Sequence, residues 1–409
     1  MRRTKSTPPS FLPWIVVGFG FLALALAFSA RAAVGLVMPI WTQELGWSRS
    51  FISGTAAGAL LVMAVVAPFA GRLIDSQGVR VTLVAGLTLV GCGCIIVSAT
   101  SNSLLFLVAF SGLSAMGFGI VATHVVSTAV ARLFNHNRGL ATGIATSGAT
   151  GGQFLIVPMI AAVLATFSWR WSFFAIGIAC LALIPFLWGT LATNEPPAEE
   201  SADRTVSSSL SADLLSIVRK PAFHILFWSF LFCGYTTAGV IETHFLPYAS
   251  FCGFGPLPSA AAYGALSAIN MLGMIGAGWL ADRVNRVALL GSIYLARGLT
   301  FIVLMNVGTD YETLLVFAVL FGAVDYATVP VTASLVASHL GLRVMGLAMG
   351  LISAGHSVGA AAGAFLGGYL FDLTLRYEWV WLSSLALAVG AGLLVFALRE
   401  QPKQTAAAI

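Results

Sequence analysis

The stretch GRLIDSQGVR at residues 71–80 reappears in altered form as GWLADRVNR at residues 278–286. In both stretches a glycine is followed four positions later by an aspartate, and each stretch ends in a basic residue. A second pair, GLATGIATSGA (139–149) and GLAMGLISAGH (346–356), is separated by the same 207 residues as the first pair. Because two distant motifs share one offset, the sequence predicts two copies of one structural unit.

The amino-acid composition indicates the environment of these two units. Hydrophobic residues make up 58% of the 409 residues and charged residues only 9%, whereas soluble domains carry about 25% charged residues. We therefore expect an integral membrane protein. The net charge of +5 comes from basic residues scattered between apolar segments, which does not favour nucleic-acid binding. The five cysteines show neither disulfide nor metal-ligand spacing, so we expect no cofactor and no metal.

Twelve apolar segments are long enough to cross a bilayer as helices, since a spanning helix needs roughly 20 residues. A polar segment with two prolines and a serine run divides them into two sets of six, and we expect it to be a flexible cytoplasmic linker. The predicted domains are a bundle at 1–192, the linker at 193–220, a bundle at 221–398 and a cytoplasmic tail at 399–409. The predicted helices are 14–40, 51–72, 80–100, 103–133, 139–166, 171–192, 221–248, 258–281, 287–307, 311–337, 344–371 and 377–398.

Lysine and arginine are distributed unevenly between the two sides of this topology. With the N-terminus inside, fifteen of these residues fall on the cytoplasmic side and three on the opposite side. We therefore expect both termini to be cytoplasmic. Because corresponding motifs lie on the same side, the halves are predicted to be parallel repeats, with a substrate site at their interface near the middle of the bilayer.

The loop between the second and third predicted helices has the pattern G-x-x-x-D-x-x-G-x-R, formed by Gly71, Asp75, Gly78 and Arg80. Together with the twelve helices and the central loop, this pattern resembles the major facilitator superfamily over essentially the whole chain. The first copy departs from the common form at Ser76, where a basic residue is usual. The resemblance implies an all-α membrane fold in which helices 1, 4, 7 and 10 line a central cavity.

The second copy of the motif keeps Gly278, Asp282, Arg283 and Arg286 but has Asn285 in place of the inner glycine. The aspartate of each copy lies at a predicted helix end, close in the topology to other helix ends. Since helix N-termini attract carboxylates through their unpaired N–H groups, both motifs can latch the cytoplasmic face closed. The alternative is an ordinary positively charged loop. The glycine rows near the motifs are expected to serve close helix packing.

Five further stretches carry a resemblance to a subgroup, the bacterial monocarboxylate-porter-like and oxalate/formate-antiporter-like transporters. They are ELGWSRSFISG (44–54), RGLATGIATSGATGGQFLIVP (138–158), THFLPYASFCG (243–253), FGAVDYATVPV (321–331) and GGYLFDLTLRYEW (367–379). The subgroup resemblance implies a multi-pass protein of the bacterial inner membrane that transports a small organic anion. Protons and the lipid bilayer are its other expected partners, and we expect a monomer.

Polar side chains inside the predicted helices are candidates for the transport site, because an ionisable group at the bilayer centre costs about 2.5–3.5 kcal/mol. Arg31 is the leading candidate, since its guanidinium presents a planar set of donors that suits a carboxylate. A structural arginine bonded to carbonyl groups is the alternative. The other expected substrate-binding residues are Gln153, Asn270, Tyr326 and His356.

Asp325 and Arg297 lie at similar depths in the tenth and ninth predicted helices, and they permit two interpretations. They can form a buried structural ion pair, which contributes little net stability but is costly to break. Alternatively, Asp325 can carry the proton that couples transport to the proton gradient. His356 lies at a similar depth, and an imidazole there can pack, bind substrate or relay a proton.

Together with the subgroup resemblance, which implies a monocarboxylate substrate, these residues predict a secondary transporter for a small organic anion, driven by proton symport. Anion exchange and export of amphipathic drugs are the alternatives within transport. We expect the protein not to be an enzyme, because the sequence contains no phosphate-binding G-x-x-x-x-G-K-[ST] stretch, no HExxH and no paired-acid motif.

Overall fold

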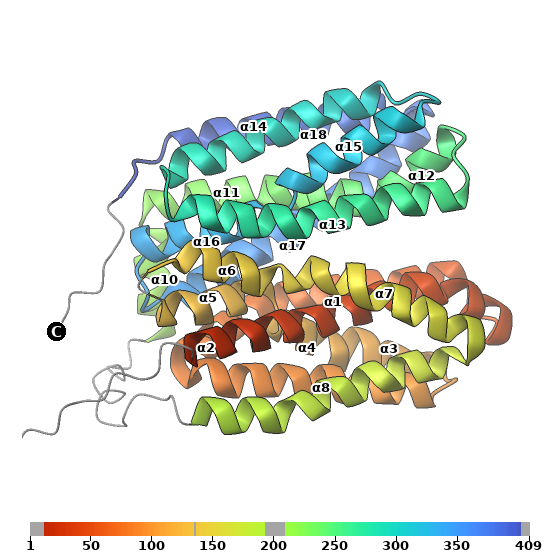
Figure 1. Ribbon diagram of the computed structural model, residues 1–409, viewed down its shortest axis with the longest axis horizontal. Coiled ribbons are helices and arrows are strands. Elements are labelled where there is room, and N and C mark those ends of the chain that lie inside the picture. Colours follow the sequence, from red (N-terminus) through yellow and green to blue (C-terminus); the bar gives the residue numbers. More distant parts are fainter. Residues whose placement is uncertain (1–11, 135, 193–208, 402–409) are drawn as a thin grey trace, which may run out of the picture.

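The computed structural model describes residues 12–134, 136–192 and 209–401, which form an elongated helical bundle (Figure 1). The bundle consists of two halves that lie side by side along its long axis. The first half contains α1 (Leu12–Glu44), α2 (Arg49–Ala99), α3 (Ser103–Leu107), η1 (Val108–Ser114), α4 (Ala115–Ile120), α5 (Thr123–Leu133), α6 (Arg138–Thr146), α7 (Gly148–Thr166) and α8 (Trp169–Ala192). The second half contains α11 (Pro221–Gly234), η2 (Tyr235–Ile241), α12 (Glu242–Phe251), α13 (Pro256–Ala281), α14 (Arg286–Met305), α15 (Tyr311–Val324), α16 (Thr328–His339), α17 (Met345–Thr374) and α18 (Glu378–Phe396).

Helix α2 comprises two membrane spans. Its 51 residues would extend about 75 Å, far more than the roughly 30 Å of a bilayer core. The helix is interrupted at Gly78, whose φ of 80° and ψ of −179° are accessible to glycine and strained for other residues. Going forward along η1 and α4, the residues contact first Thr55 and then Val66 on the segment before Gly78, so that segment runs in the same direction. On the segment after Gly78 they contact first Gly93 and then Val90, so that segment runs in the opposite direction. The two segments therefore run in opposite directions.

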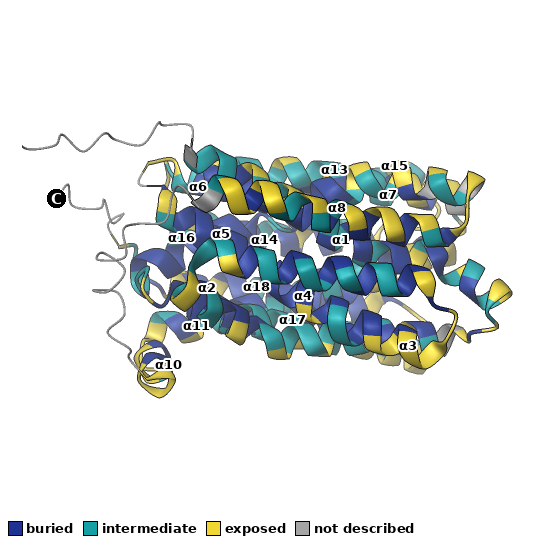
Figure 2. Cartoon of the chain, turned by 90° about the horizontal axis from the view of Figure 1, so that it is seen from below, coloured by how far each residue is buried: buried dark blue, intermediate teal, exposed yellow. Residues whose placement is uncertain are grey.

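The described part of the chain contains eleven helical stretches long and apolar enough to cross a membrane, and α2 supplies two spans. The twelve predicted spans are thus confirmed. Exposed positions follow the outer helices of the bundle, including α8 (Figure 2), and Phe69, Phe186 and Phe365 are 65%, 68% and 71% exposed. A soluble protein would not display such side chains over its length, and a bilayer accommodates them.

Several spans are not continuous α-helices. The fourth span contains the π-helix η1 and is interrupted between α4 and α5, at Val121 and Ala122. The tenth span is interrupted between α15 and α16, at residues 325–327. Since a broken helix leaves main-chain groups without intrahelical partners, irregular backbone at membrane depth is tolerated where it lines a cavity or is buried in protein. Both interruptions contribute to the cavity described below.

The linker differs in part from the flexible tether that the sequence predicted. Residues 193–208 lie outside the described residues, but the remainder contains the helix α10 (Leu210–Val218). The hydroxyl of Ser209 accepts a hydrogen bond from the N–H of Ala212 and so caps this helix. Asp213 of this helix is fully buried. We call the end of the bundle at which α10 lies the linker end; it is on the left in Figure 1.

Candidate functional site

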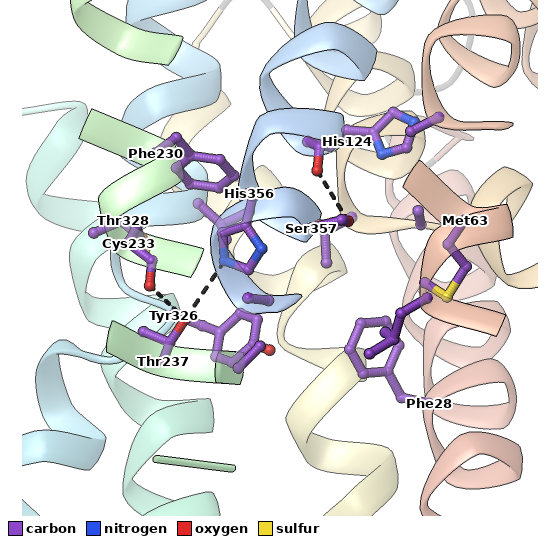
Figure 3. A pocket seen from close by; sticks show the side chains of 18 of the residues that line it. Phe28, Met63, His124, Phe230, Cys233, Thr237, Tyr326, Thr328, His356 and Ser357 are labelled. Carbon is purple, nitrogen blue, oxygen red and sulfur yellow. Dashed lines mark hydrogen bonds between the residues drawn. The ribbon is translucent and has the colours of Figure 1, made fainter. Parts of the chain in front are cut away.

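A cavity of about 90 Å³ lies between the two halves (Figure 3). Side chains from α1, α2, α11, η2 and α17 line it, together with residues at the interruptions of the fourth and tenth spans. Of the predicted site residues, Arg31, Asp325, Tyr326 and His356 are among the lining residues. Its volume leaves room for several water molecules or a small solute.

Arg31 lies on α1 and is partly buried. Its guanidinium carbon is 4.8 Å from the centroid of the Phe28 ring, so one face of the group is stacked. Among the described residues, the Arg31 guanidinium forms no hydrogen bond and no ion pair. Its planar set of N–H donors is therefore available to an anion in the cavity.

Asp325 is the first residue of the interruption in the tenth span, directly after α15 ends at Val324. The Nδ2 of Asn270 on α13 donates to Oδ2 of Asp325 at 2.8 Å, and its Oδ1 accepts from the main-chain N–H of Tyr326 at 3.1 Å. Asp325 is 4% exposed, and its Oδ1 has no hydrogen-bond partner among the described residues. Asn270 therefore holds the interruption in place and binds one oxygen of a carboxylate whose other oxygen is unpaired.

Arg297 on α14 contacts Asp325 differently from the predicted ion pair. Its Nη2 donates to the main-chain carbonyl of Val324 at 2.7 Å and to the main-chain carbonyl of Asp325. Its Nη1 is 2.9 Å from Sγ of Cys233, and within the described ranges it forms no salt bridge with a carboxylate. The guanidinium thus binds the carbonyl groups left unpaired at the end of α15, where a positive charge is also favoured by the helix dipole.

Tyr326 and Glu242 connect the tenth span to the seventh. The hydroxyl of Tyr326, a cavity residue, donates to Oε1 of Glu242 at 2.7 Å. Glu242 begins α12, directly after the π-helix η2. Sequence reasoning did not include Glu242 in the site because the residue lies near the outer end of a predicted helix. The signal that could have found it is an acid within an otherwise apolar span.

His356 on α17 faces the cavity. Its ring centroid is 4.9 Å from that of Phe230, and its Nε2 is 3.5 Å from Oγ1 of Thr237, which is long for a hydrogen bond. The main chain of α17 approaches α11 closely here, since a Cβ on Gly234 would lie 2.7 Å from the carbonyl carbon of His356. The imidazole also interacts with the thiol of Cys233, and it borders the space that a solute would occupy.

Gln153 and His124 are two further polar residues of the first half that could contact a substrate. Gln153 lies on α7, outside the residues that line the cavity, so its predicted substrate contact has no support from this geometry. His124 on α5 lines the cavity and is 2% exposed. Sequence reasoning did not include His124 among the site residues, because it lies nearer the cytoplasmic end of the predicted helix 103–133.

At the linker end, Asp75 joins the two halves. Its Oδ1 accepts from the N–H of Gly346 at 2.9 Å and its Oδ2 accepts from the N–H of Leu347 at 2.8 Å, at the start of α17. Arg132 forms a salt bridge with the same carboxylate and donates to the carbonyl of Leu342 at 3.1 Å. A carboxylate of the first half therefore caps a helix of the second half.

Asp282 forms the corresponding contact in the opposite direction. Its two carboxylate oxygens accept from the N–H groups of Gly139 and Leu140, at 2.8 and 2.9 Å, at the start of α6. The halves approach each other through glycines, since a Cβ on Gly278 would lie 3.0 Å from the carbonyl carbon of Gly139. The two latch contacts thus follow the same repeat that the sequence shows.

A third contact between the halves comes from the linker. Oδ2 of Asp213 is 2.5 Å from Nη1 of Arg72 in the first half, and Oδ1 is 2.7 Å from Nη1 of Arg343 in the second half. Sequence reasoning missed this contact because α10 was expected to be flexible. With Asp75 and Asp282, Asp213 holds the linker end closed.

Of the other motif residues, Gly71 packs against the second half, since a Cβ on it would lie 2.6 Å from the carbonyl carbon of Gly346, and the rest contact their own halves. Gly78 forms the interruption in α2, and the guanidinium of Arg80 stacks on Trp188 at 3.5 Å. Arg283 stacks on Trp279 at 4.1 Å. Arg286 binds Glu400 and the main-chain carbonyl of Gln401, and so fixes the start of the predicted C-terminal tail.

A family model described as the Major Facilitator Superfamily matches residues 20–309 and 272–408. The chain belongs to the major facilitator superfamily. Members of this superfamily are transporters, which confirms the sequence-based prediction of a multi-pass membrane transporter that is not an enzyme.

Similar proteins place this superfamily member near the monocarboxylate transporters. It is 25% identical over 374 residues to the uncharacterized MFS-type transporter YcxA of Bacillus subtilis, covering 90% of each chain. It is 26% identical over 393 residues to monocarboxylate transporter 13 of Rattus norvegicus, covering 93% of this chain and 88% of the relative. The proton:xylose symporter XylE shares the fold, with a TM-score of 0.79 at 14% identity over 95% of this chain and 96% of that chain.

Proposed function

We propose that this superfamily member is a secondary active transporter of a small monocarboxylate, coupled to protons and working by alternating access. The observation that carries the proposal is Arg31, a guanidinium that lines the cavity between the halves with no anionic partner among the described residues. The similarity to monocarboxylate transporters supports the substrate class.

Arg31 provides the charge that recognises the substrate. A carboxylate can accept two parallel hydrogen bonds from one guanidinium, and such charge-assisted pairs are stronger than neutral ones. Phe28 stacks on the group and restricts its orientation. His356 and Tyr326 line the same cavity and can hydrogen-bond the remainder of a small hydroxy or keto acid.

Asp325 supports the coupling part of the proposal. It lies in the cavity wall with one carboxylate oxygen bonded to Asn270 and the other unpaired among the described residues. A carboxylate in the wall of the substrate cavity can take up a proton when substrate binds, so protonation and substrate binding can be linked there. Arg297 binds the carbonyl of Asp325 and not its carboxylate, which leaves the carboxylate able to take up a proton.

The latch contacts support alternating access. Asp75, Asp282 and Asp213 each join the two halves at the linker end, and each contact must break for that end to open. In parallel repeats, access alternates when one half rocks against the other around a central site. We place the linker end and both termini in the cytoplasm of a bacterium, with the chain acting as a monomer in the inner membrane.

The direct test is uptake into proteoliposomes. Purified protein should accumulate a radiolabelled monocarboxylate such as lactate when an inward proton gradient is imposed. Arg31→Gln should abolish this uptake. Arg376→Gln should not, because this arginine is 70% exposed and lies at the end of the bundle opposite the linker end. Equal uptake by the Arg31→Gln variant and the wild type would refute the proposal.

Exchange and drug export are the alternatives, and the unpaired acid in the cavity favours the second of these. A cation exporter would bind its substrate through Asp325. Vesicles with and without internal anion separate the first possibility: an obligate exchanger takes up lactate only when the vesicles contain a counter-anion, whereas a symporter also accumulates lactate into empty vesicles under a proton gradient. Transport of a lipophilic cation such as tetraphenylphosphonium that survives Arg31→Gln but not Asp325→Asn indicates export.

A further inference from the structure

Cys233 on α11 lines the cavity beside His356 and Thr328 (Figure 3). Its side chain is 3% exposed, and its sulfur is 3.6 Å from Oγ1 of Thr328. The residue has no role in the latch or in binding by Arg31, and nothing in the sequence marks it beyond a position in an apolar helix.

The Cys233 sulfur has a positively charged neighbour. Nη1 of Arg297 is 2.9 Å from Sγ, and Arg297 is fully buried. Its other hydrogen-bond acceptors are the two main-chain carbonyls of Val324 and Asp325. Among the described residues, Cys233 is therefore the ionisable side chain that accepts a hydrogen bond from this buried cation. A buried cation is costly without an anion, and a thiolate at Cys233 would provide one in direct contact with the guanidinium.

The surroundings of the thiol also indicate that a ligand reaches it. Asp325 lines the same cavity, is 4% exposed, and has an Oδ1 without a partner among the described residues. A buried carboxylate oxygen without a protein partner leaves an acceptor beside the cavity for a water molecule or a polar solute. Arg31, on the opposite half, presents its donors to the same space.

We propose that Cys233 is a reactive thiolate in the substrate cavity, and that small electrophilic carboxylates modify it covalently. The selectivity for carboxylates rests on the proposed function, because Arg31 would draw the anion into the cavity. With a 2-haloacid, the sulfur attacks the carbon that bears the halogen and forms a C–S bond. The carbon–halogen bond breaks, halide leaves with its electron pair, and the thioether fills the cavity.

The other cysteines of the chain provide internal controls. Cys94 and Cys180 are fully buried, and Cys92 and Cys252 are partly exposed. Exposure alone predicts that Cys92 and Cys252 react before Cys233. A thiolate at Cys233 predicts the opposite order, because the thiolate is the nucleophilic form.

The test uses purified wild-type protein, the Cys233→Ser variant and the matched control Cys252→Ser, with modified peptides quantified by mass spectrometry. Iodoacetate should carboxymethylate Cys233 about tenfold faster than Cys252. Cys233→Ser should remove this rapid modification and Cys252→Ser should preserve it. Modification of Cys233 no faster than that of Cys252, by iodoacetate and by neutral iodoacetamide, would overturn the inference.

A comparison of the two reagents separates this inference from the proposed function. Arg31→Gln should slow modification by iodoacetate about tenfold, as expected for loss of a charge-assisted contact, and leave modification by iodoacetamide unchanged. If Arg31→Gln slows neither reagent, the anchoring role fails while the reactive thiolate stands. If a protein that takes up lactate shows no rapid modification of Cys233, the proposed function stands and the thiolate is wrong.

Discussion

Gly278 provides a test of how closely the two halves must meet at the linker end. A Cβ at this position would lie 3.0 Å from the carbonyl carbon of Gly139 and 3.1 Å from Cα of Gly143, and closer still to the carbonyl oxygen of Gly139. Because carbon atoms pack at about 3.5–4.0 Å, Gly278→Ala forces α13 and α6 apart by about 1 Å. The variant should therefore disfavour the state that is closed at the linker end.

The size of the effect follows from overpacking. Inserting a methyl group into a packed interface costs about 1–3 kcal/mol, which shifts the equilibrium between closed and open states about 5- to 150-fold. Gly276→Ala, on the same helix, is the matched control, because a Cβ at Gly276 would have no described neighbouring atom within 4 Å. The control should leave the equilibrium unchanged.

Distances between spin labels measure this equilibrium. The exposed residues Leu133 and Val284 lie at the linker end in opposite halves, and both can be replaced by cysteine and labelled. The three native cysteines most able to react, Cys92, Cys233 and Cys252, are replaced by serine in all samples. Gly278→Ala should shift the distance distribution to longer values. If it gives the same distribution as Gly276→Ala, the close approach of the halves does not control opening.

Three further predictions concern the latch, the loop and the coupling residue. Asp213→Asn should shift the same label distances to longer values, because a buried carboxylate loses two arginine partners from opposite halves; an unchanged distribution would refute this role. Gly78→Ala should destabilise the protein by about 1–3 kcal/mol, since a backbone conformation reserved for glycine becomes strained. Its melting temperature should fall relative to Gly189→Ala, a glycine with no described atom near its Cβ position, and equal melting temperatures would contradict this. Asp325→Asn should lose gradient-driven accumulation of lactate but keep lactate exchange, and retained accumulation would exclude Asp325 as the proton carrier.

The spans, the repeat and the two latch aspartates could be predicted because their signals are local. Apolar runs of membrane length define spans by themselves. The duplicated glycines and aspartates mark positions where backbones meet, and Asp75 and Asp282 do bind helix N-termini across the interface. A carboxylate near a helix start needs no knowledge of distant residues to be placed correctly.

The contacts of the cavity could not be predicted in the same way. The Arg297–Asp325 ion pair, one of the two interpretations of these residues, presupposes a continuous tenth helix in which the carbonyl groups have partners. The helix is interrupted, so Arg297 binds the freed carbonyls and the carboxylate goes to Asn270. Pro330, in the first turn of α16, is the local signal that a new helix begins nearby.

Asp213, Glu242 and Cys233 show a second limit of sequence reasoning. Each acquires its partners from segments more than 60 residues away, so no local pattern identifies them. Residue type alone suggested a solvated linker acid, an interfacial acid and a packing cysteine. Only the packing of the two halves, and of α10 across them, gives these side chains their neighbours.

Calorimetric titration of purified protein with monocarboxylates tests the central claim most directly. The wild type should bind lactate or a related monocarboxylate but neither sugars nor lipophilic cations. Hydrogen bonds to a charged group contribute about 1.5–3 kcal/mol, so Arg31→Gln should weaken binding about 10- to 150-fold. Carboxylate binding of equal affinity in the wild type and in Arg31→Gln would contradict the assignment of Arg31 as the substrate anchor.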